Sequence, residues 1–169
     1  MYKLIITSLC LFISSLLFSQ TEIGAEYQHG FGKSYNSNSL GALYENFSSG
    51  RGSLCIVAHY TWDIFTTKKV TKGVSDLGIS FGYRYGFSYG NSGNLFTGIR
   101  ATFSFIDEKD HIKFTPSAEL GYHLTFNNFG KGGFTTPSIA FGYDLPLVKK
   151  EEDYQGPLFI PRLAVGYRF

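Results

Sequence analysis

The last thirteen residues of the chain, 157–169, alternate between two kinds of side chain. Counted back in twos from the C-terminus, the first set is apolar: Phe169, Tyr167, Val165, Leu163, Pro161 and Phe159. From residue 162 onward the second set is basic or small: Arg162, Ala164, Gly166 and Arg168. A period of two places successive side chains on opposite faces of a β-strand. The sequence therefore predicts a terminal strand with one apolar face and one polar face.

This ending resembles that of the bacterial outer-membrane β-barrel proteins, whose final strand ends in Phe with aromatic or apolar residues at alternate positions before it. The matching residues are Leu163, Val165, Tyr167 and Phe169. The resemblance implies that these four residues form the signal read by the barrel-assembly machinery, and that the last strand pairs with the first. It also implies a location in the outer membrane of a Gram-negative cell envelope, but it implies no particular activity.

The same period of two recurs along most of the chain and is clearest over residues 76–89. We expect eight strands, at about 21–32, 40–47, 53–64, 76–89, 95–105, 112–126, 135–145 and 157–169. Residues 40–47 show no clean apolar stripe and are assigned as a strand on parity, because an even number of strands places both ends of the barrel domain on the periplasmic side. Pro116 cannot donate a ladder hydrogen bond, so we expect a bulge or a local gap there.

The connections alternate in kind. Polar or charged loops are expected at 33–39, 66–73, 107–111 and 147–156, and short turns rich in Gly, Asn and Ser at 48–52, 90–94 and 127–133. Long outer loops that alternate with short periplasmic turns are typical of a membrane barrel. We therefore predict an all-β fold: an eight-stranded antiparallel up-and-down transmembrane β-barrel similar to the OmpA/OmpX type, with an apolar exterior and a polar, ion-paired interior.

Residues 1–20 have the pattern of a cleaved secretory signal peptide. Lys3 is followed by a mostly apolar run of 15 residues, 4–18, which is short for a membrane-spanning helix. Its removal leaves residues 21–169 as one barrel domain. The removal of Lys3 also leaves 14 basic against 13 acidic residues, a net charge of about +1, which gives no basic field to attract nucleic acid.

Charged residues gather on the polar faces of the expected strands. The predicted lumen charge network contains Glu26, Asp63, Asp76, Arg84, Arg100, Glu119, Asp144, Arg162 and Arg168. Charges in a narrow lumen are costly unless they are paired. An eight-stranded barrel is also just wide enough to be filled by its interior side chains. We therefore expect an ion-paired plug without a continuous pore, with a narrow channel lined by the same charges as the alternative.

The residues with catalytic character are Glu119, His123 and Thr125, which share one face of a single expected strand. Such a row could supply an acid, a base and a nucleophile. The pair His123 and Thr125 resembles the His-x-Ser pair of outer-membrane lipid A acyl hydrolases, with Thr in place of Ser. The simpler interpretation is a hydrogen-bond network in the lumen, and we expect no enzyme activity. The histidines and Cys55 show no metal-ligand spacing, and no cofactor is expected.

Together these patterns predict an integral outer-membrane protein with a structural or loop-mediated binding role. Outer-membrane lipid and the assembly machinery are its expected partners, and the sequence identifies no extracellular ligand. Two alternatives are the narrow channel and the lipid-modifying enzyme. A third is a soluble periplasmic barrel that binds a small ligand. In that case the aromatic face would form the core and the arginines would lie on the surface.

Overall fold

The computed structural model describes residues 20–32, 35–47, 51–66, 75–87, 93–106, 111–126, 131–147 and 155–169, so the expected signal peptide lies outside it except for Gln20. All elements of this part are strands: β1 (Gln20–Gly32), β2 (Tyr35–Phe47), β3 (Gly52–Thr66), β4 (Asp76–Gly86), β5 (Gly93–Ile106), β6 (His111–Thr125), β7 (Gly132–Pro146) and β8 (Gly156–Arg168). The eight predicted strands are therefore confirmed, with shifts of a few residues at their ends.

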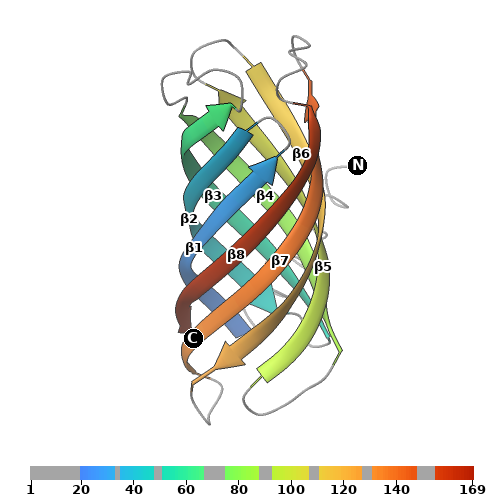
Figure 1. Cartoon of the computed structure of the whole chain (residues 1–169). Coiled ribbons are helices and arrows are strands. Elements are labelled where there is room, and N and C mark those ends of the chain that lie inside the picture. Colours follow the sequence, from blue (N-terminus) through green and yellow to red (C-terminus); the bar gives the residue numbers. More distant parts are fainter. Residues whose placement is uncertain are drawn as a thin grey trace, which may run out of the picture.

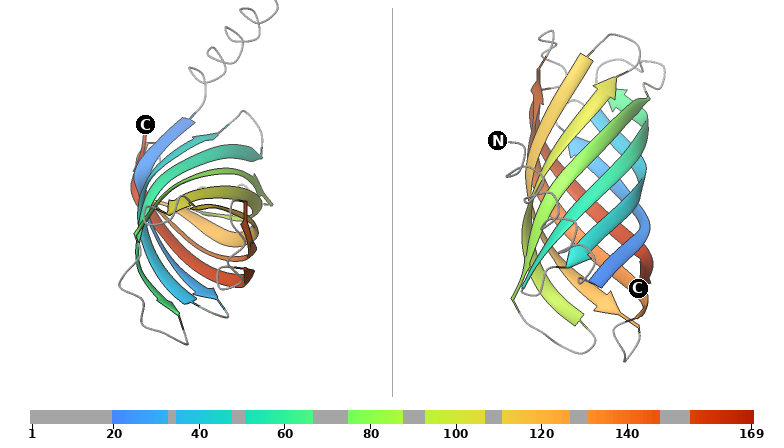
Figure 2. Two further views of the ribbon diagram at one scale, coloured as in Figure 1. Left: turned by 90° about the horizontal axis from the view of Figure 1, so that it is seen from above. Right: turned by 180° about the vertical axis from the view of Figure 1, so that it is seen from behind.

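The strands form one closed barrel (Figures 1 and 2). Each strand pairs antiparallel with the next, and β8 pairs with β1, so that Ala25 lies opposite Val165. The backbone N–H of Phe169 donates to the carbonyl of Thr21 at 2.9 Å, which extends this seam to the C-terminus. We call the end of the barrel that holds Gln20 and Phe169 the proximal end, and the opposite end the distal end.

Side chains alternate between the inside and the outside of the barrel along each strand. On β8 the side chains of Leu163, Val165 and Tyr167 are 47–48% exposed, whereas Arg162 and Ala164 are buried. The charged residues buried inside are Glu22, Glu26, Glu45, Asp76, Arg84, Arg100, Lys113, Glu119, Asp144 and Arg162. The polar, ion-paired interior therefore follows the period-two pattern of the sequence.

Strand β2 differs from the sequence prediction. The prediction of a loop over 33–39 is wrong for residues 35–39, because β2 begins at Tyr35; residues 33–34 lie outside the described part. Asn and Ser are typical of turns, but here both neighbouring strands supply ladder partners and the inner face of the barrel is polar. Ser39 points inward and shares a 2.8 Å hydrogen bond with Thr61. The strand assigned to 40–47 on parity is confirmed.

The other predicted connections were also too long at several ends. The strands extend into them at Gly52, Thr66, Gly93, His111, Gly132 and Gly156. Most remaining residues of those connections lie outside the described part, so their expected lengths and roles stay predictions.

Pro116 produces a gap in the ladder and no bulge. It pairs normally with Ala101 of β5, but the pairing of β6 with β7 is interrupted between Phe114 and Ser117. The register is the same on both sides of this interruption, as Phe114 pairs with Leu145 and Ser117 with Gly142. The gap agrees with the missing N–H of proline and does not shift the strands, and the same pairing is interrupted again between Gly121 and Leu124, where β6 has no proline.

A small apolar cluster inside the barrel consists of Leu43, Cys55, Val57, Phe134 and Ala164. The thiol of Cys55 is free and buried. Its apolar neighbours in the cluster suit a cysteine that packs as a small hydrophobic side chain. Apart from such apolar residues, the interior is filled by polar and charged side chains.

Candidate functional site

The middle of the barrel is crossed by a cluster of six buried charged residues, which we call the central network. Its members come from six different strands: Glu26, Glu45, Arg84, Arg100, Glu119 and Arg162. Three arginines face three glutamates, so the network has no net charge. Because each ion is paired, the large cost of placing charges away from water is offset.

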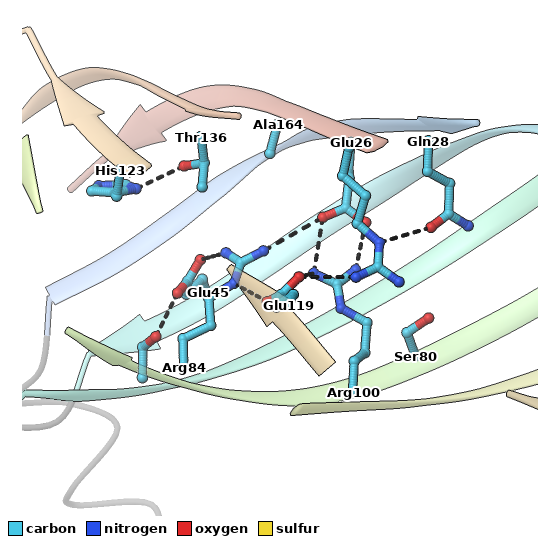
Figure 3. Close-up of polar contacts among 12 residues, drawn as sticks. Glu26, Gln28, Glu45, Ser80, Arg84, Arg100, Glu119, His123, Thr136 and Ala164 are labelled. Atoms are coloured by element: carbon cyan, nitrogen blue, oxygen red, sulfur yellow. Dashed lines mark hydrogen bonds and ion pairs between the residues drawn. The ribbon is translucent and has the colours of Figure 1, made fainter. Parts of the chain in front are cut away.

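Glu119 of β6 lies at the centre of this network. Its Oε1 accepts a hydrogen bond from Arg84 Nε at 2.7 Å, and its Oε2 accepts from Arg162 Nη1 at 2.9 Å. Arg100 Nη2 lies 3.4 Å from the same Oε2. Figure 3 shows the side chains of Arg84 and Arg100 pointing toward the carboxylates of the cluster. One carboxylate therefore ties together three strands besides its own.

The other two glutamates complete the pairing. Glu26 of β1 accepts two bonds from Arg100, at 2.5 and 3.1 Å, in the bidentate arrangement that suits a guanidinium. Glu45 of β2 accepts from Arg84 Nη1 at 2.5 Å and from the Ser53 hydroxyl at 2.5 Å. The guanidinium of Arg84 also lies 4.8 Å from the ring centroid of Phe96, a cation–π contact.

Glycines on the inner face give these long side chains room. A Cβ added to Gly98 would lie 2.8 Å from the carbonyl oxygen of Tyr83, 3.1 Å from Glu119 Cγ and 3.2 Å from Arg84 Cγ. Contacts of that length are tighter than ordinary van der Waals packing, so a larger residue would push the charged side chains aside. The alternation of Gly with charged residues on β4 and β5 therefore serves the packing of the central network.

A second group of polar residues lies toward the proximal end. Arg168 Nε donates to Glu22 Oε1 at 2.7 Å, and Arg168 Nη2 lies 2.8 Å from His123 Nε2. His123 Nδ1 is 2.7 Å from the hydroxyl of Thr136, and these two residues lie apart from the central network in Figure 3. We call Glu22, His123, Thr136 and Arg168 the proximal group.

His123 Nε2 lies between two groups of opposite character. It is 2.8 Å from Arg168 Nη2, which donates, and 3.1 Å from Glu22 Oε1, a carboxylate oxygen, which accepts. The imidazole therefore connects the Glu22–Arg168 pair of the proximal group to the Thr136 hydroxyl on its Nδ1 side. Thr136 is only 1% exposed.

The three catalytic candidates of the sequence are not brought together. Glu119 belongs to the central network, whereas His123 contacts Glu22, Thr136 and Arg168. No contact joins Thr125 to either of them among the described residues. Residues four apart on a strand share a face but are separated along it by about 13 Å, which explains why one face does not make one site.

A third group lies toward the distal end and contains His59, Asp76, Lys113 and Asp144, which we call the distal group. Lys113 Nζ lies 3.5 Å from Asp144 Oδ2, and the Thr115 hydroxyl donates to Asp144 Oδ1. The side chain of Asp63, which was predicted to join the lumen charges, lies outside the described part.

The predicted lumen residues therefore fall into three groups. Glu26, Arg84, Arg100, Glu119 and Arg162 lie in the central network, Arg168 lies in the proximal group, and Asp76 and Asp144 lie in the distal group. The prediction missed Glu45, because residues 40–47 show no stripe that would assign its direction. Glu22 and Lys113 were also missed as members, although both occupy polar positions of alternating segments and could have been found.

In the described part of the chain, no group of three or more His, Cys, Asp or Glu side chains is arranged to hold a metal ion. The same residues include no helix long and apolar enough to cross a membrane. The chain matches no protein-family model and shows no significant similarity to a curated protein sequence. The architecture is compatible with that of small eight-stranded barrels of the OmpA/OmpX type.

Proposed function

We propose that this chain is an integral outer-membrane β-barrel protein with a closed lumen and a structural or loop-mediated binding role. The observation that carries the proposal is the distribution of side chains, with ionised groups inside and large hydrophobic side chains outside. A soluble barrel has the opposite distribution. Large hydrophobic side chains on a barrel wall require lipid or another apolar partner around it.

The residue types of the outer wall support a lipid environment. Exposed aliphatic side chains lie near mid-barrel at Ile56, Ile99, Leu120 and Ile139, beside the exposed aromatic side chains of Phe81 and Tyr83. Exposed aromatic side chains lie toward the distal end, at Phe31, Tyr60, Phe105 and Tyr143, and toward the proximal end, at Tyr85, Phe87, Tyr122 and Tyr167. An apolar wall with aromatic side chains toward both of its ends suits a bilayer, because aromatic rings favour the headgroup level.

The central network supports a closed lumen. Its six side chains come from six strands and contact one another across the barrel, so they occupy the space through which a solute would pass. Outer-membrane lipid around the wall and the barrel-assembly machinery during biogenesis are the proposed partners. In this proposal the four outward-facing residues of the terminal strand, Leu163, Val165, Tyr167 and Phe169, form the assembly signal.

The test is the heat-modifiable gel mobility of the protein extracted from membranes. We expect the wild-type protein to require detergent for extraction and to migrate as a compact species unless heated. Deletion of Phe169 should reduce the folded fraction in membranes severalfold. Phe87→Ala is the matched control, since it removes an exposed aromatic residue near the same end but outside the terminal strand, and it should assemble normally.

Two results would contradict the proposal. A wild-type protein that stays in the aqueous phase without detergent would favour the soluble periplasmic barrel. If the wild type and the Phe169 deletion assemble equally well, the terminal strand is not the assembly signal. That result would contradict this part of the proposal and would not affect the proposed membrane location. The lipid-hydrolase alternative has its own assay, in which activity on lipid A must be present and must be lost in His123→Ala.

A further inference from the structure

A polar cavity of about 40 Å³ lies inside the barrel on the distal side of the central network. Its wall includes Ser39, Thr61, Thr102 and Ser104, together with His59, Asp76, Lys113 and Asp144 of the distal group. One water requires about 10–15 Å³ of such space, so the cavity can hold about three waters or one small solute. Arg162 also lines the cavity, which places the central network at its proximal side.

Three buried polar atoms at this cavity have no hydrogen-bond partner among the described residues. They are His59 Nδ1, Asp76 Oδ1 and Asp144 Oδ2. The three residues are 5%, 2% and 1% exposed. A buried carboxylate oxygen without a donor is costly. Lys113 Nζ lies 3.5 Å from Asp144 Oδ2 and supplies a positive charge there, whereas Asp76 Oδ1 has neither a hydrogen-bond donor nor an ion-pair partner among the described residues.

The charge of the cavity wall differs from that of the other two groups. The central network has three positive and three negative groups, and in the proximal group Glu22 is matched by Arg168. The distal group has two carboxylates, and Lys113 lies close enough to Asp144 to offset one of them. Asp76 forms no ion pair within the described part. The described wall thus carries one carboxylate that is not balanced by an arginine or lysine.

We propose that the distal cavity binds a compact monovalent cation at the carboxylate of Asp76, with help from the neighbouring hydroxyl groups of the cavity wall. The size of the cavity favours an ion such as ammonium or a partly hydrated potassium ion over a larger organic cation. A tightly chelated metal is not favoured, because three metal-ligating side chains do not converge here. The proposal depends on the barrel and its lumen, and it does not depend on the membrane location.

The test uses the chain without residues 1–20, folded in one nonionic detergent at pH 7. Ammonium chloride or potassium chloride is titrated at constant ionic strength, with N-methyl-D-glucamine chloride as the bulky balancing salt. A ligand that binds only the folded state raises the thermal midpoint, by about 3–5 °C at ten times its Kd. We expect a saturable rise with ammonium or potassium, and the stronger of the two identifies the ion.

Asp76→Asn should lower the affinity for the ion at least about tenfold. The matched control is Glu22→Gln, which removes a buried lumen carboxylate from the opposite end and should leave the ion affinity unchanged. If Asp76→Asn does not fold, the signal of ¹⁵N-labelled ammonium provides a readout on the wild type, since it should broaden on binding and sharpen again when potassium is added.

Equal midpoints in all three salts, together with an unbroadened ammonium signal, would overturn the proposal and leave a water-filled cavity. An ion response that persists at full strength in a folded Asp76→Asn protein would also overturn it, because the bound ion would then lie elsewhere.

Discussion

Glu119 is the residue on which the lumen charges most depend. It contacts Arg84, Arg100 and Arg162 in a region where all four side chains are nearly inaccessible to water. When one member of a buried ion cluster is neutralised, the remaining ions keep their desolvation cost but lose part of their pairing. The cost of losing Glu119 should therefore exceed that of losing a surface carboxylate by a wide margin.

We expect Glu119→Gln to lower the free energy of unfolding by about 3–5 kcal/mol, because three arginines would then face two glutamates. Addition of Arg162→Gln to that variant restores equal numbers of charges, so its further cost should be smaller than its cost in the wild type. Urea unfolding of the protein in lipid vesicles, with the four proteins of the cycle, measures this coupling.

The control cycle combines Glu22→Gln with Arg162→Gln, since no contact joins these residues among those described. Their effects should add within about 0.5 kcal/mol. If the Glu119 and Arg162 effects also simply add, the central network is a set of separate pairs and not one coupled unit.

At the residue scale, the sequence predicted which way each side chain points far better than which residues it contacts. Glu26, Arg84, Arg100, Glu119 and Arg162 all point inward as the period of two requires. Which residues contact one another depends on strand register and tilt, and neither can be inferred from the sequence of a single strand. Glu119 and His123 share a face but belong to different groups, and Glu45 joins the network from a strand whose sequence shows no stripe.

At the scale of elements, the seam between β1 and β8 is built for close approach. Gly24 and Gly166 lie opposite each other in the register, and the ring of Phe134 covers both. A Cβ added to Gly166 would lie 2.2 Å from the carbonyl oxygen of Ile23 and 2.5 Å from the Cα of Gly24. These are backbone atoms, which cannot move aside as the end of a side chain can.

We therefore expect Gly166→Ala to destabilise the barrel by about 1–3 kcal/mol through overpacking at the closing seam. Gly133→Ala on β7 is the matched control, because its added Cβ would meet no atom closer than Phe126 Cδ2 at 3.6 Å. The folded fraction in gel-mobility experiments and the urea midpoint both measure the difference. Equal stability of the two variants would show that the seam relaxes to accept a methyl group.

The sequence predicted elements well where the two faces of a strand differ. Strand β4 alternates Leu77, Phe81 and Tyr83 with Asp76, Ser80 and Arg84, and its structure follows that pattern. Strand β2 begins with Asn and Ser on both faces, so composition indicated a loop although the ladder on both sides holds it extended. Only the requirement for an even number of strands indicated that residues 40–47 form a strand.

At the scale of the whole molecule, the three charged groups divide the lumen along its axis, and the central network alone connects six of the eight strands. Such a cluster does two things at once: it fixes the strands to one another from inside, and it fills the cross-section of a narrow barrel. A proposed outer-membrane protein of this kind should therefore be stable and closed, and its function should lie at its ends or on its wall.

Electrical recording tests that closure directly. In a planar lipid bilayer the wild-type protein should give no steady ion current. A variant with Glu26→Ser, Arg84→Ser, Arg100→Ser and Glu119→Ser removes two positive and two negative groups, so the open space in the lumen increases while its net charge stays the same. This variant should conduct, because water and ions can enter the space that the four side chains filled. Ile99→Ala, which changes an exposed residue at similar depth on the outer wall, is the control and should stay closed. Steady current through the wild type would instead favour the narrow channel, with the arginines and glutamates lining the ion path.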